Sequence, residues 1–101
     1  MERERHIVTT TVDWQGITLS VSYETAYCGL SWNSHLQIQS ISPERARLPV
    51  TKTGYLSHFC HPDDVEAYGG PTGYVLAWLE EAAKSKEWQE YQRSTQQLSL
   101  F

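Results

Sequence analysis

The sequence has few cysteines, few basic residues and no long apolar run, and each shortage excludes a class of protein. Two cysteines among 101 residues are too few for the disulfide framework of a small secreted domain. Eight Lys and Arg stand against twelve Asp and Glu, giving a net charge of −4. A nucleic-acid interface needs clustered basic side chains. No apolar run reaches transmembrane length, and the first residues lack the apolar segment of an export signal. We therefore expect a cytoplasmic protein that contacts neither nucleic acid nor membrane directly.

Apolar and aromatic residues are plentiful enough for a folded core. Hydrophobic residues make up 40% of the chain, and four of them are tryptophan. A chain of this length normally forms one domain. We expect a single α+β domain over residues 1–93 and a C-terminal tail over residues 94–101. The oligomeric state stays open.

Apolar and polar residues alternate in the first half of the chain, which is typical of strands with one buried face. The alternation covers residues 6–14 and 17–24, with turn residues at 13–16 between them. A third strand follows, with Trp32, Leu36 and Ile38 facing inward. Residues 53–59 predict a fourth strand, in which Tyr55 and Phe59 are candidate core anchors.

The second half predicts helix. A short helical turn begins near His61 and ends at Gly69 and Gly70, and a main helix extends from about residue 71 to about residue 93. Its apolar stripe contains Val75, Trp78, Leu79 and Ala82. Ser85 could cap a second helical piece, with a kink beside it. The predicted fold is a three- to four-stranded antiparallel sheet packed against one long C-terminal helix, followed by a flexible tail.

The last five residues form a short apolar segment after a polar stretch. They are Gln97, Leu98, Ser99, Leu100 and Phe101. This string resembles the motif by which bacterial polymerases and repair proteins bind the replication sliding clamp, and it matches the family consensus at every position. The resemblance implies that Gln97 fixes the register while the apolar side chains enter pockets on the clamp. The alternative is that the tail folds back and caps the domain's own core.

A second resemblance concerns residues 48–59, which are similar to a stretch in small uncharacterised proteins of bacterial mobile elements. Together, the two resemblances imply a non-enzymatic adaptor or accessory protein, encoded by a plasmid or phage, that binds the sliding clamp. An alternative is an anti-defence protein that blocks a nuclease or CRISPR complex with an acidic face. Its candidate residues are Glu80, Glu81, Glu87 and Glu90.

The densest group of chemically reactive side chains is His58, Cys60 and His61, with two aspartates following. Cysteine and histidine are zinc ligands, but the spacing fits no standard zinc motif. A cysteine beside a histidine could also form a nucleophile–base pair, although no orienting third group is evident. A small metal- or cysteine-dependent enzyme is therefore the remaining alternative. We expect no metal, no cofactor and no catalytic residue.

The tyrosines and tryptophans are numerous for so small a core. Tyr23, Tyr27, Trp32, Tyr55, Tyr68 and Tyr74 cannot all be buried. Exposed aromatic side chains can form an interface, whereas buried ones would replace the missing Leu and Ile of the core. The sequence does not separate these two possibilities.

Overall fold

A computed structural model describes residues 7–98. Four strands form one antiparallel sheet in chain order, so each strand pairs with the next. This confirms the predicted sheet, including its fourth strand. The strands are β1 (Ile7–Trp14), β2 (Ile17–Glu24), β3 (Ser34–Ser42) and β4 (Tyr55–Cys60). A short 3-10 helix, η1 (Tyr27–Gly29), lies between β2 and β3.

The hairpin between β1 and β2 is closed by Gln15 and Gly16. Both residues have positive φ, 49° and 82° respectively. A two-residue turn of this kind matches the right-handed twist of the paired strands. Trp14 consequently pairs directly with Ile17, and the register of the whole hairpin follows from this turn.

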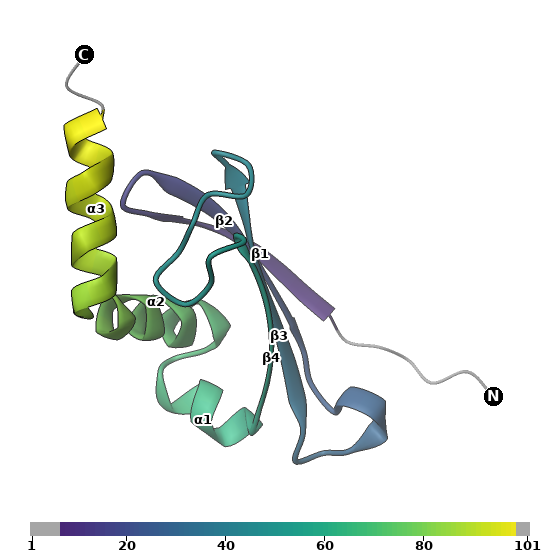
Figure 1. Ribbon diagram of the computed structural model, residues 1–101. Helices are drawn as coiled ribbons and strands as arrows, with labels where there is room; N and C mark the ends of the chain where they lie inside the picture. The colour runs from purple at the N-terminus through teal and green to yellow at the C-terminus, as the bar shows by residue number, and fades with distance from the viewer. Residues whose placement is uncertain (1–6, 99–101) are drawn as a thin grey trace.

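Three helices lie on one face of the sheet and leave the other face open (Figure 1). They are α1 (Pro62–Ala67), α2 (Pro71–Ala82) and α3 (Lys86–Leu98). The predicted single helix over residues 71–93 is wrong. The chain breaks after Ala82, and Ser85 Oγ accepts a hydrogen bond from the Trp88 backbone N–H at 3.2 Å, as a helix N-cap does. The predicted kink beside Ser85 is therefore the junction of two helices, and α3 continues past residue 93 to Leu98.

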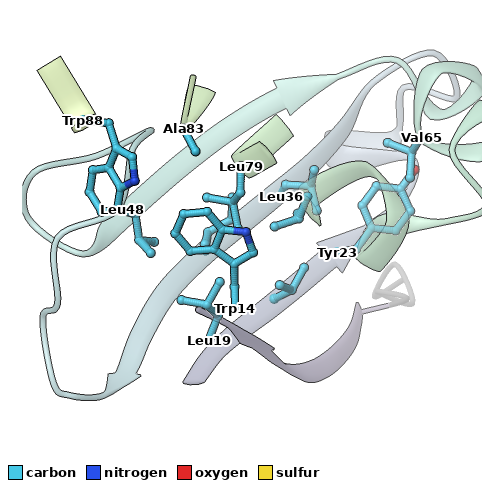
Figure 2. Packing of buried hydrophobic residues seen from close by; sticks show 12 residues of the cluster. Trp14, Leu19, Tyr23, Leu36, Leu48, Val65, Leu79, Ala83 and Trp88 are labelled. Atoms are coloured by element: carbon cyan, nitrogen blue, oxygen red, sulfur yellow. The ribbon is translucent and has the colours of Figure 1, made fainter. Parts of the chain in front are cut away.

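The core lies between the helices and the inner face of the sheet (Figure 2). Val75 and Leu79 of α2 are fully buried, as the predicted stripe required, and so are Leu36 and Ile38 of β3. Trp14 and Trp88 close one end of the core, with ring centroids 5.9 Å apart. This contact joins β1 to α3.

Three aromatic residues predicted to face inward are exposed instead. Trp32 is 58% exposed because it lies in the turn before β3. Tyr55 and Phe59 are exposed because the pairing of Ile38 with Leu56 sets the register of β4. Even-numbered residues of β4 therefore face the core, and odd-numbered residues face outward.

The open face of the sheet carries two adjacent rows of uncharged polar side chains. One cross-strand row consists of Thr9, Ser22, Gln37 and Ser57, one from each strand. Thr9 and Ser22 hydroxyls lie 3.2 Å apart. The next row continues the pattern with Thr11, Ser20, Gln39 and Tyr55. Within residues 7–98, no helix has both the length and the apolar character needed to cross a membrane.

Candidate functional site

The predicted clamp-binding segment begins at the end of α3. Gln97 and Leu98 are the last two helical residues, and Ser99, Leu100 and Phe101 lie outside the described residues. Gln92 Nε2 donates to Gln15 Oε1 at 2.8 Å and joins the middle of α3 to the hairpin turn. Figure 1 shows α3 standing alongside this turn. The segment thus follows the part of α3 that is joined to the domain.

A groove of about 380 Å³ lies between α3, the hairpin turn and residues 43–47. Its apolar wall includes Ile17, Trp88 and Tyr91. The Arg47 guanidinium lies 4.4 Å from the centre of the Tyr91 ring, and it donates to Glu87 at 3.1 Å. Within the described part of the chain, neither Arg47 Nε nor Trp88 Nε1 has a hydrogen-bond partner. Both nitrogens are buried, so the groove itself is mainly an apolar surface.

The structure does not gather His58, Cys60 and His61 into one site. His58 and Cys60 lie on the inner face of β4. His61 instead caps α1, where its Nδ1 accepts a hydrogen bond from the Asp63 backbone N–H at 3.1 Å. Among residues 7–98, no three His, Cys, Asp or Glu side chains are grouped so that they could hold a metal ion.

Cys60 has the surroundings of a structural cysteine. Its Sγ lies 3.4 Å from Ser34 Oγ, and the Ser34 hydroxyl donates to the Cys60 carbonyl oxygen at 2.6 Å. Burial raises the pKa of the Cys60 thiol, and the Asp64 charge adds to this, although the hydrogen bond with Ser34 opposes it. A thiol that stays protonated at neutral pH is a poor nucleophile.

Three of the four glutamates of the predicted acidic face make contacts of different kinds. Glu80 accepts a hydrogen bond from the Trp14 indole. Glu81 pairs with Lys84 at 3.1 Å, and Glu87 pairs with both Arg47 and Lys52. Since Glu80 and Glu81 are on α2 while Glu87 and Glu90 are on α3, the break between the helices divides the set. Neighbouring cations also neutralise part of its charge.

A second hollow, of about 370 Å³, is walled by aromatic rings, and we call it the aromatic pocket. Three elements supply its lining: β4, the end of α1 and the outer side of α2. The Tyr68 and Tyr74 ring centroids are 5.5 Å apart, and those of His58 and Trp78 are 4.6 Å apart. The lining residues are His58, Tyr68, Tyr74, Ala77, Trp78 and Glu81.

The connection between α1 and α2 brings Tyr68 against α2. Gly69 and Gly70 have φ of 83° and 118°, values that favour glycine. Their amides close α1 by bonding to the carbonyls of Glu66 and Val65. A Cβ at Gly73 would overlap the Tyr68 carbonyl oxygen. Glycine at position 73 therefore permits the close approach that sets Tyr68 beside Tyr74.

The aromatic pocket carries no cationic lining residue at neutral pH. Burial lowers the pKa of His58, and the nearby His35 lowers it further, so His58 is neutral. Its Nε2 lies 3.3 Å from the Tyr74 hydroxyl. Burial also raises the pKa of Tyr74, as do the charges of Cys60 and Asp64. Glu81 is the one carboxylate among the lining residues.

The sequence indicated a surplus of aromatic residues but not this grouping. Tyr74 and Trp78 are four residues apart, so they lie on the same side of α2. Tyr68 directly precedes the two glycines that turn the chain back. Those two signals could have placed three rings together, although the contribution of His58 depends on the sheet register.

Comparison with known proteins gives one family. The family model described as the KlcB third domain matches residues 7–88, which span the sheet, α1, α2 and the start of α3. No curated protein and no solved structure matches the chain.

Proposed function

Because the chain belongs to the KlcB third-domain family, we propose a plasmid-associated accessory protein that acts by binding other proteins rather than by catalysis. Membership of that family supports the plasmid-associated accessory role. The proposed partner is the bacterial replication sliding clamp. The proposed contact is the segment Gln97–Phe101.

The agreement of these five residues with the whole clamp-binding motif carries the proposal. Its position supports it, because the segment follows Gln92, through which α3 is joined to the hairpin. Thr95 Oγ1 donates to the Tyr91 carbonyl of its own helix at 3.0 Å, and Thr95 borders the groove. A partner could therefore reach the segment without disturbing the sheet.

Binding of the segment in a groove of the clamp requires the end of α3 to unwind. Leu98 and Leu100 would point to nearly opposite sides of a helix, but side chains two residues apart share one face of an extended segment. The last turn of α3 has no basic side chain to complement the helix dipole. Unwinding the final residues therefore removes little stabilisation, and the two leucines can then enter one groove of the clamp together.

The test is titration of a purified bacterial sliding clamp with the intact chain and with three variants. One lacks residues 97–101, one carries Leu100→Ala with Phe101→Ala, and the matched control carries Ser99→Ala. We expect the intact protein and the Ser99→Ala control to bind with a Kd of about 1–10 μM. The deletion and the double alanine variant should each bind at least about tenfold more weakly. Equal binding by all four proteins would contradict the proposed contact.

Urea unfolding of the same proteins distinguishes a clamp-binding segment from a core-capping tail. If the segment only binds a partner, its removal leaves the free energy of unfolding within about 0.5 kcal/mol of the intact value. If Leu98, Leu100 and Phe101 cap the core, removal costs several kcal/mol, at about 1.5–3 kcal/mol for each buried side chain.

A further inference from the structure

The aromatic pocket suits a rounded cation. The Tyr68 and Tyr74 ring planes meet at 83°, those of Tyr74 and Trp78 at 66°, and those of His58 and Trp78 at 50°. Rings set at steep angles surround a group from several sides, whereas a planar guanidinium favours a flat stacking surface. We propose that the aromatic pocket binds an alkylammonium group, presented by a lysine side chain of a partner protein.

The charge of the pocket supports the same occupant. Cations are attracted to the faces of Trp and Tyr rings. Glu81 adds a carboxylate to the lining, and the Asp64 charge is close enough to act on Tyr74. The neutral His58 does not repel a cation, and the rings of Tyr74 and Trp78 beside it are also uncharged. An anion would meet no positive group among the lining residues.

Lys84 shows how an ammonium group is held at the rim. Its Nζ lies 3.1 Å from Glu81 Oε2, and both side chains are about three-quarters exposed. An exposed ion pair of this kind adds little stability. An incoming ammonium group could therefore replace Lys84 at Glu81 and gain the ring contacts as well. Lys84 competes with the partner for the carboxylate.

The rings are held in position before any ligand binds. Tyr74 and Trp78 project from consecutive turns of α2, and Gly73 allows Tyr68 to approach that helix. The contact between His58 Nε2 and the Tyr74 hydroxyl joins β4 to α2 at the back of the pocket. Preorganised walls reduce the entropy lost on binding. None of the lining residues belongs to the segment Gln97–Phe101, so the pocket offers a second contact.

The first experiment titrates the intact protein with tetramethylammonium and, in parallel, with the neutral tert-butyl alcohol. The Trp78 indole N–H resonance reports binding, and Trp78→Phe assigns it. We expect tetramethylammonium to bind with a Kd of about 1–10 mM, and the alcohol to bind at least about threefold more weakly. Equal binding of the cation and the alcohol would overturn the proposal.

Two charge variants and one control test the role of Glu81. Glu81→Gln should weaken tetramethylammonium binding about threefold or more, and Lys84→Ala should tighten it, because the competing ammonium is removed. Glu90→Gln, at an exposed position of α3, is the matched control and should leave binding unchanged. Glu81 and Lys84 are both exposed, so neither substitution should disturb the fold. An unaltered Kd in Glu81→Gln would contradict the site.

Peptides extend the test to the proposed partner. A peptide with lysine or trimethyllysine should shift the Trp78 resonance, and the same peptide with acetyl-lysine should not. The chain lacking residues 97–101 should give the same result, which separates this site from clamp binding. An acetyl-lysine peptide that binds as tightly as the cationic ones would refute the proposal.

Discussion

The indole Nε1 of Trp14 donates a hydrogen bond to Glu80 Oε1 at 2.9 Å, which joins the end of β1 to α2. Trp14 is nearly fully buried, so its N–H would lose its partner if Glu80 were shortened. A buried donor without a partner costs about 1–3 kcal/mol. This bond is therefore one of the specific contacts that fix α2 on the sheet.

We expect Glu80→Ala to lower the free energy of unfolding by about 1–3 kcal/mol, measured by urea denaturation. Glu80→Gln keeps an acceptor oxygen and should cost less than Glu80→Ala. Glu90→Ala, an exposed glutamate of α3, is the control and should change stability little. Equal losses in Glu80→Ala and Glu90→Ala would show that the bond to Trp14 contributes nothing.

Gly73→Ala should destabilise the protein even though alanine favours helix. In an open helical position this exchange stabilises by about 0.5–1 kcal/mol. At position 73 the added Cβ meets the Tyr68 backbone, and forced overlap typically costs about 1–3 kcal/mol. Thermal unfolding checks the sign. A rise in Tm would mean that Tyr68 moves away from α2 without cost.

Stability should depend on pH through His58. Burial lowers the folded-state pKa of His58 below 6.5, so the unfolded chain binds more protons between the two pKa values. The free energy of unfolding therefore rises with pH through that window, and this contribution is lost as pH falls through the folded-state pKa. NMR titration of His58 measures the pKa directly. The variant His58→Gln should lose this part of the pH dependence. A folded-state His58 pKa above 6.5 would contradict the predicted rise of stability with pH.

Cys60 should react slowly with thiol reagents. Its raised pKa and its burial both lower the fraction of accessible thiolate. We expect alkylation by iodoacetamide at pH 8, followed by mass spectrometry of the Cys60 peptide, to be slower than alkylation of the urea-unfolded chain. A faster rate in the folded protein would instead indicate an activated thiol and revive the cysteine-enzyme alternative.

Local alternation predicted the strands because one face of each strand is buried. Ile17–Glu24 shows the pattern most clearly, with Leu19, Val21 and Tyr23 all buried. The pattern was ambiguous in β4, where both residue sets contain apolar side chains. Pairing with β3 decides the inward set there, which is a contact between distant parts of the chain. Alternation alone therefore places Tyr55 and Phe59 on the wrong face.

The helix break has a similar cause. The residues around Ala83 and Lys84 favour helix, so propensity alone predicts continuation. The chain instead turns at Ser85, and Trp88 of the second helix packs against Trp14. Tertiary packing thus overrides local preference. The aromatic pocket is only partly predictable for the same reason, because the fold alone brings His58 of β4 to the rings of Tyr68, Tyr74 and Trp78.

The uncharged rows on the open face of the sheet should respond to salt differently from the aromatic pocket. Dissolved ions screen exposed charges over about 8–10 Å under ordinary conditions. A contact made through Glu81 on the helical side should weaken as ionic strength rises. The row from Thr9 to Ser57 carries no charge of its own, so a contact confined to that row should respond less to salt. Ionic strength therefore distinguishes a contact made through Glu81 from one confined to this row.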